Sequence, residues 1–176
     1  NDESGNGNHG IVNGATLTTD RFGNANSAYS FDGNGDYILI PNSNSLSFID
    51  NFTFSLWFTA PVGDVLLAKS GDRTGLGIKV HTTSKDIGVE NGRCCPVHGI
   101  YAGNVPNNDW HMISVTHGNG MIRSYLDGVL ITEESASVFN LNPQMANENI
   151  FLGMGPSGWY YYNGKIDDVR IYNRAL

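Results

Sequence analysis

Short runs of β-branched and aromatic residues recur along the chain and are separated by glycine, asparagine and other turn residues. Such runs predict strands. The alternation is clearest in Gly164–Tyr172, where hydrophobic and charged residues follow one another with period two. Strands are expected at 27–31, 36–40, 52–59, 65–68, 77–81, 87–90, 99–102, 111–117, 121–126, 129–134, 149–153 and 164–172.

Helical patterning is almost absent. The segment Ser135–Ala146 is the one candidate for a helical turn, and Pro143 interrupts it. Turn pairs join the expected strands; Asp127-Gly128 between two hydrophobic runs is the sharpest hairpin signal. About a dozen short strands at this spacing predict an all-β fold, a two-sheet antiparallel β-sandwich or jelly roll, in one domain over residues 1–176.

The expected closing strand carries two adjacent carboxylates. Regular alternation sends Asp168, Arg170 and Tyr172 to one face, and Asp167, Val169 and Ile171 to the other. Two aspartates in a hydrophobic strand are costly unless each charge is compensated, by Arg170 or by a metal ion.

Charge and hydropathy exclude two classes of partner. A net charge of −7 and scattered basic residues argue against nucleic acid, and mildly favour cations as ligands. No run reaches the roughly 18 apolar residues of a membrane span, so membrane insertion is not expected. Because the sequence starts abruptly in a motif with no signal peptide before Asn1, we expect a mature or excised domain of an exported protein, located outside the cell or at its surface.

The two cysteines are neighbours, Cys94 and Cys95. Adjacent Cα atoms lie about 3.8 Å apart, below the usual disulfide range, so a bridge between them would be strained. A vicinal disulfide, two free thiols and bridges to another chain all stay open.

Several motifs in a fixed order resemble the laminin G-like jelly-roll domains, the concanavalin A-like lectin/glucanase group. They are D-E-S-G-N-G-N-H-G at 2–10, A-Y-S-F-D-G-N-G-D-Y-I at 28–38, F-T-F-S-L-W-F at 52–58, D-W-H-M-I-S-V-T at 109–116, S-Y-L-D-G at 124–128, I-F-L-G at 150–153 and G-K-I-D-D-V-R-I-Y-N-R-A-L at 164–176. They span nearly the whole chain.

The resemblance implies a structural calcium ion between the N-terminal loop and the closing strand. Calcium takes six to eight oxygen ligands, which carboxylates, amides and carbonyls of a glycine-rich loop can supply. Carried over to matching positions, the ligands are Asp2, Asn6 or Asn8, and one of Asp167 and Asp168. Alternatively, these side chains cap turns and the aspartates pair with Arg170 or Arg174. For Asp32 and Asp36, turn chemistry is favoured over a cation site.

The aromatic run after Gly153 is the candidate ligand surface. Sugars pack their C–H groups on aromatic faces, and Trp159, Tyr160, Tyr161 and Tyr162 follow a Gly/Pro loop. The alternative is a core strand whose phenol groups reach solvent. Related jelly rolls of the pentraxin type hold ligands through calcium on a carboxylate-rich loop, but no Asp or Glu lies between Gly153 and Lys165.

Catalysis is not expected, so the chain is interpreted as a non-enzyme. The paired acids that glycosidases need on one strand face are missing, because Glu133-Glu134 and Asp167-Asp168 are adjacent pairs. Trp57 and Trp110 lie in hydrophobic runs and are expected in the core. The function expected is a carbohydrate-binding, lectin-like module for a polysaccharide or other glycan. The alternative is a structural, protein-binding or adhesion domain of a cell-surface or viral appendage.

Overall fold

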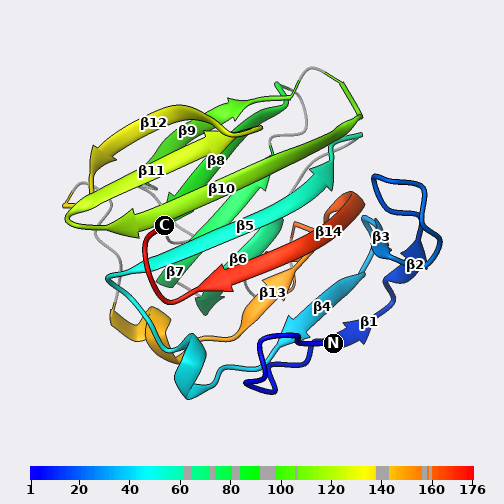
Figure 1. Cartoon of the computed structure of the whole chain (residues 1–176), viewed down its shortest axis with the longest axis horizontal. Coiled ribbons are helices and arrows are strands. Elements are labelled where there is room, and N and C mark those ends of the chain that lie inside the picture. Colours follow the sequence, from blue (N-terminus) through cyan, green and yellow to red (C-terminus); the bar gives the residue numbers. More distant parts are fainter. Residues whose placement is uncertain are drawn as a thin grey trace.

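Two antiparallel sheets face one another in the computed structural model of the chain (Figure 1). The structure describes residues 1–61, 65–71, 74–80, 84–91, 98–105, 107–137, 143–155, 158 and 160–176. In this part of the chain each sheet has seven strands, and the helical content is limited to the short 3-10 turns η1 (Asn44–Leu46) and η2 (Pro143–Asn147). No helix among these residues is long and apolar enough to span a membrane.

The strand order mixes early and late parts of the chain. The first sheet runs β1 (Ile11–Asn13), β4 (Tyr37–Ile40), β13 (Ile150–Leu152), β6 (Val65–Gly71), β7 (Thr74–Val80), β8 (Asp86–Asn91) and β9 (His98–Asn104). The second sheet runs β12 (Val129–Ser135), β11 (Met121–Leu126), β10 (Trp110–Gly118), β5 (Phe52–Thr59), β14 (Asn163–Tyr172), β3 (Ala28–Asp32) and β2 (Thr16–Thr18).

All twelve expected strands are present, as β3 to β14, and the two-sheet jelly roll is confirmed. The sequence pattern missed β1 and β2, which have three residues each and are too short to show a period. The expected Asp127-Gly128 hairpin joins β11 to β12, and Asp127 has the positive φ of 51° that such a turn requires.

The core lies between the sheets. Along the central strand β5, Phe54, Leu56 and Phe58 are fully buried, whereas Ser55 and Trp57 are half-buried. Alternate residues of a strand point to opposite faces, so Ser55 and Trp57 lie on the outer face of the second sheet. Each buried Phe or Leu contributes about 1.5–3 kcal/mol, which is why these side chains set the orientation of the strand.

A bulge in β14 changes the faces expected for the closing strand. The register shifts between Asp167 and Arg170, and Asp168 has a φ of 49°. The extra residue resets the alternation, so Ile166, Val169 and Ile171 all pack against the core. The prediction that placed Asp167 on one face with Val169 and Ile171 is therefore wrong.

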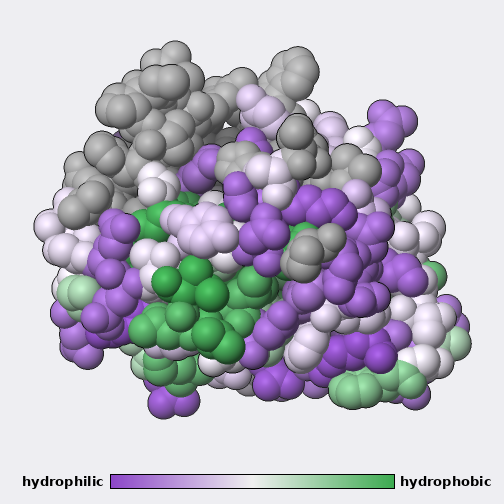
Figure 2. Space-filling view, turned by 90° about the horizontal axis from the view of Figure 1, so that it is seen from above, coloured by the Kyte–Doolittle hydropathy of each residue, from purple (hydrophilic) through white to green (hydrophobic). Residues whose placement is uncertain are grey.

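One outer edge of the second sheet is hydrophobic. Edge strand β12 exposes Val129, Leu130 and Ile131, and Figure 2 shows a hydrophobic patch over this strand. Its neighbours Glu133 and Glu134 are charged, which limits pairing of this edge with other strands.

Candidate ligand-binding site

A shallow groove crosses the outer face of the second sheet. We call it the sheet-face groove; its volume is about 350 Å³, and it is lined by Thr53, Ser55, Met112, Ser114, Thr116, Tyr125, Gly128, Arg170, Tyr172 and Leu176. These residues come from β5, β10, β11 and β14, from the β11–β12 turn and from the C-terminal tail. Figure 1 shows the tail turning from the end of β14 across β5.

Strand pairing arranges the lining side chains in rows. Arg170 pairs with Ser55, Ser55 with Ser114, and Ser114 with Tyr125, so one row crosses four strands. At roughly 4.8 Å between strands, the row spans about 14 Å. The groove therefore has a hydroxyl floor with a guanidinium at one end and a phenol ring at the other.

The next row repeats this chemistry. Tyr172 pairs with Thr53, and Thr53 pairs with Thr116. The Thr53 hydroxyl donates to the carbonyl of Arg174 at 2.9 Å and accepts from the amide of Leu176 at 3.1 Å, which holds the tail as a wall of the groove.

Hydrogen bonds within the floor leave capacity for a ligand. The Ser114 hydroxyl donates to Ser55 Oγ at 3.0 Å. A serine hydroxyl has one donor and two acceptor sites, so the Ser55 hydroxyl proton and the Ser114 lone pairs can bind a polar ligand.

Sequence reasoning missed this groove, although a signal was present. The outward positions of β5 and β10 are Thr53, Ser55, Trp57 and Thr59, and Trp110, Met112, Ser114 and Thr116, with no charged residue among them. A solvent-facing sheet surface usually carries charges. An uncharged row of hydroxyls and large side chains is therefore a mark of a binding surface.

The two tryptophans expected in the core lie on this outer face instead. Both are half-buried rather than buried. Trp57 lies between buried Leu56 and Phe58, and Trp110 pairs with Thr59, which lies on the same face of β5 as Trp57. Trp57 is covered by the guanidinium of Arg21, 4.6 Å from the ring centroid, and Arg21 also lies 4.3 Å from the ring of Phe22. The core prediction failed because β-branched and aromatic composition does not tell which face of a strand is inward.

The aromatic run near the start of β14 divides into buried and exposed rings. Tyr162 is fully buried, packs against Phe31 and donates its hydroxyl to the carbonyl of Thr59. Burial raises the pKa of this phenol well above its usual value. Tyr162 is therefore a core residue, and the prediction that it contacts ligand is corrected.

The other residues of the run keep their candidate role. Tyr160 is 52% exposed, and Lys79 Nζ lies 4.3 Å from its ring centroid. Tyr161 is half-buried, and Trp159 lies outside the described residues. Lys79 alternates with buried Leu76 and Ile78, so Tyr160 lies toward the outer face of the first sheet, opposite the groove.

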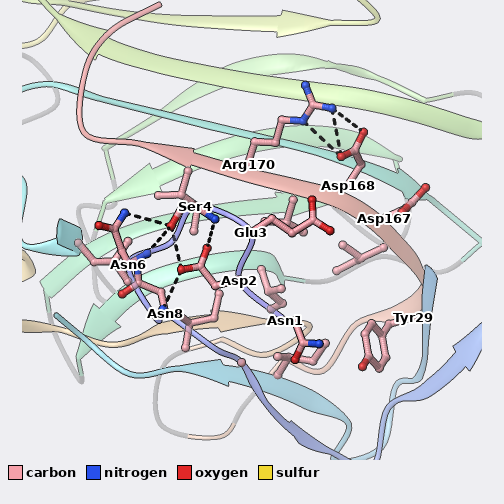
Figure 3. Close-up of a pocket in the computed structure, with 18 of the residues that line it drawn as sticks. Asn1, Asp2, Glu3, Ser4, Asn6, Asn8, Tyr29, Asp167, Asp168 and Arg170 are labelled. Atoms are coloured by element: carbon pink, nitrogen blue, oxygen red, sulfur yellow. Dashed lines mark hydrogen bonds and ion pairs between the residues drawn. The ribbon is translucent and has the colours of Figure 1, made fainter. Parts of the chain in front are cut away.

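A second hollow, which we call the edge cleft, lies where the N-terminal loop meets β14. Its volume is about 750 Å³. All five expected calcium ligands, Asp2, Asn6, Asn8, Asp167 and Asp168, are among its lining residues, which also include apolar side chains of β1, β4 and β14. Figure 3 shows residues 1–8 and β14 around this cleft.

The oxygens of the N-terminal loop are used in local hydrogen bonds. Asp2 accepts from the amide of Ser4 at 2.9 Å, from the Ser4 hydroxyl at 2.8 Å and from the amide of Asn8 at 2.9 Å. The backbone N–H of Ser4 is the largest of the causes that lower the pKa of Asp2 to about 2. Asn8 Oδ1 accepts from Ser43 Oγ at 2.6 Å, which ties the loop to η1.

Both aspartates of the closing strand are bound by arginine. Arg21 donates to Asp167 Oδ2 at 2.6 Å and to Asp168 Oδ2 at 3.1 Å, and Arg170 adds a contact of 3.0 Å to Asp168. Burial raises the pKa of Asp167, and Arg21 opposes this shift. Arg174, the other partner expected from the sequence, is not among the cations that pair with these described carboxylates.

In this arrangement the expected calcium ligands are bound by other groups of the chain. Among the described residues no group of three or more His, Cys, Asp or Glu side chains is placed to hold a metal ion. An ion at the closing strand would compete with Arg21 for the same carboxylates. The calcium ion stays a prediction, and the arrangement follows the alternative of capped turns and arginine pairs.

Two further sequence features have a plain outcome. Asp36 accepts from the amide of Asp32 at 3.0 Å and Asp32 from the amide of Asn34 at 2.7 Å, as the turn interpretation requires. Cys94 and Cys95 lie outside the described residues.

Comparison with known proteins identifies the family. A family model described as the concanavalin A-like lectin/glucanases superfamily matches residues 32–176. The chain belongs to this superfamily. The resemblance read from the ordered sequence motifs is thereby confirmed. No curated protein sequence matches the chain.

Solved structures share the fold at low sequence identity. They include the botulinum neurotoxin serotype D binding domain (TM-score 0.68, 16% identity, 97% of this chain and 44% of that one). Domain 4 of AbnA, a GH43 extracellular arabinanase from Geobacillus stearothermophilus, in complex with arabinotriose, has a TM-score of 0.61 with 18% identity over 95% and 83% of the two chains. The Ruminococcus gnavus IT-sialidase CBM40 bound to α2,3 sialyllactose has a TM-score of 0.62 with 12% identity over 94% and 92%. The chain thus spans less than half of the neurotoxin domain, and each likeness shows the fold alone.

Proposed function

We propose that the chain is a non-catalytic, lectin-like carbohydrate-binding module of an extracellular protein, and that glycan binds in the sheet-face groove. The observation that carries this proposal is the row Arg170–Ser55–Ser114–Tyr125, in which two serine hydroxyls lie between a guanidinium and a phenol ring.

The chemistry of the groove suits a sugar. Sugar rings present hydroxyls at their edges and C–H groups on their faces. The serine and threonine hydroxyls of the floor can exchange hydrogen bonds with the former, and the rings of Tyr125 and Tyr172 can pack against the latter. Arg170 provides several N–H donors, and its side chain is 59% exposed.

Proteins with the same fold support carbohydrate binding in general terms. Two structural neighbours were solved with arabinotriose and with α2,3 sialyllactose. Fold alone does not define a ligand, so these sugars serve as first probes and not as assignments.

The charged residues support a binding rather than a catalytic role. Asp167 and Asp168 are bound to Arg21, and Glu133 pairs with Arg123 at 2.5 Å. A general acid or base must be free to exchange a proton with substrate.

The test is a binding measurement with one variant on each outer face. Wild type, Tyr125→Ala and Tyr160→Ala are compared on a glycan array and then by calorimetry with arabinotriose, α2,3 sialyllactose and the best array ligand. If the groove binds glycan, Tyr125→Ala weakens binding by about five- to 150-fold, because a packed aromatic ring contributes on the order of 1–3 kcal/mol. Tyr160→Ala then leaves binding unchanged.

If Tyr160→Ala weakens binding and Tyr125→Ala does not, the binding site lies in the aromatic run around Tyr160 and Tyr161, as the sequence suggested. Wild-type protein that binds no glycan would contradict the proposal and favour a structural or adhesion domain. Equal melting temperatures of the three proteins serve as the folding control.

A further inference from the structure

The strand β14 has a free edge beside the edge cleft. Its pairing with β3 covers Asn163 to Ile166 only, whereas its pairing with β5 continues to Tyr172. From Asp167 to Tyr172, no described strand lies on the side opposite β5. At about 3.4 Å per residue, these six residues offer roughly 20 Å of unpaired edge.

The neighbouring N-terminal loop does not pair with this edge. Asp2 and Asn8 bind within the loop and to Ser43 and Ser45, and no hydrogen bond joins residues 1–8 to β14 in the described structure. Figure 3 shows the loop and the strand facing the same hollow, with dashed contacts only inside each of them.

The hollow leaves part of the core-facing side of β14 open to solvent. The edge cleft has a volume of about 750 Å³ and continues into the core, where Ile38, Leu152 and Ile166 are nearly buried and Val169 and Ile171 stay partly exposed. An apolar wall of this size needs a partner that excludes water.

The unpaired edge and the apolar wall together define the partner. We propose that the edge cleft accepts an extended polypeptide segment from outside residues 1–176, which adds as a strand beside Asp167–Tyr172. Main-chain hydrogen bonds to β14 hold such a strand, and alternate side chains fill pockets. Because Val169 and Ile171 point inward, the occupant has apolar residues at every second position.

The charge at the rim of the cleft indicates which residues the occupant carries at its outward and terminal positions. The side chains that line the cleft include four carboxylates, of Asp2, Glu3, Asp167 and Asp168. The guanidiniums of Arg170 and Arg21 bind two of them, so two negative charges remain in excess at this rim. The occupant therefore carries Lys or Arg at its outward or terminal positions, where it complements this acidic rim.

The experiment fuses a candidate strand to the protein. Asn1 lines the cleft, so a short Gly/Ser linker in front of it suffices for an added peptide to reach β14. The peptide has Val and Leu at alternate positions, Thr between them and Lys at both ends. Fusion gives a high local concentration, so even weak docking is populated.

Docking is read by hydrogen exchange and by thermal unfolding. We expect new protection of backbone amides in Val169–Tyr172 and a melting temperature raised by about 5–10 °C, the scale for a ligand far above its dissociation constant. The control fusion has the same composition with the apolar residues grouped, and we expect no new protection from it.

Two matched variants locate the docked strand. Ile171→Ser, in the cleft, is expected to remove the protection and the thermal shift. Leu130→Ser, on the exposed edge strand β12 at the far side of the same sheet, is expected to leave both unchanged. Protection at β12, equal effects of both fusions, or no protection at β14 would overturn the proposal.

Discussion

The sheet-face groove and the edge cleft differ in how many of their strand edges and side chains have a partner within the chain. In the groove, the strands β5, β10 and β11 are paired on both sides, and the hydroxyls of Ser55 and Ser114 bond to one another. In the cleft, one strand edge and part of an apolar wall lack a partner among the described residues. The groove, a shallow polar surface whose hydroxyls are already hydrogen-bonded, suits reversible ligand binding. The cleft, with its unpaired strand edge, suits the addition of another polypeptide segment as a strand.

This difference predicts that changes in the cleft alter stability, and that changes in the groove alter binding. The largest effect is expected for Ile166→Ala, because Ile166 is only 3% exposed. Loss of this side chain should lower the free energy of unfolding by about 3 kcal/mol. Ile171→Ala, on the open part of the wall, should cost about 1 kcal/mol. Urea unfolding measures both; equal losses would show that the wall at Ile171 is as closed as at Ile166.

The aspartate pair of β14 should show the next largest effect. The side chain of Asp167 is 10% exposed and that of Asp168 30% exposed. Asp167→Asn replaces one of the two carboxylates that half-buried Arg21 contacts by a neutral amide. We expect the free energy of unfolding to fall by about 2 kcal/mol. Asp168→Asn should cost less than about 1 kcal/mol, as for other exposed pairs, and Asn tolerates its positive φ. A larger loss at Asp168 would contradict this ranking.

In the groove, a hydroxyl should affect binding without affecting stability. Given a glycan ligand, Ser114→Ala removes one hydrogen bond from the floor and should weaken affinity about fivefold, as for a bond of about 1 kcal/mol. Ser30→Ala, on β3 of the same sheet but outside the groove lining, is the matched control. Calorimetry measures the affinity and melting curves measure the stability of each variant. An equal loss of affinity in Ser114→Ala and Ser30→Ala would show that the ligand binds outside the groove.

Calcium binding can be tested through its competition with Arg21. If calcium binds at Asp167 or Asp168, it raises the melting temperature of Arg21→Gln more than that of wild type, because the glutamine leaves the carboxylates available. The measurement is thermal unfolding in EDTA and after addition of excess calcium. An equal response of the two proteins would exclude these two aspartates as ligands.

The smallest effect concerns pH at the rim of the cleft. The pKa of Asp2 is about 2 in the folded chain, below its usual value of 3.8. A lowered folded-state pKa means that its contribution to stability is present above about pH 4 and is lost as the pH falls toward 2. Carboxyl chemical shifts should show this midpoint, and Ser4→Ala should raise it by removing the hydroxyl donor while keeping the amide donor.

The fold was largely predictable because strand periodicity and turn chemistry are local. The alternation in Phe52–Thr59 and the Asp127-Gly128 turn each depend on a few consecutive residues, and both are present in the structure. The site was less predictable. Ser55, Ser114 and Tyr125 come from three strands, and only strand order and register bring them into one row.

The sequence by itself determined the all-β class, the positions of strands β3 to β14, the acidic charge and the superfamily, since these follow from residue type and short-range order. Only the tertiary structure decided which face each residue occupies. The β14 bulge placed Asp167 and Val169 on opposite faces of the strand. Trp57 and Trp110 lie on the outer face, and Tyr162 lies in the core. These outcomes depend on long-range packing, where one extra residue in a strand reverses every side chain beyond it.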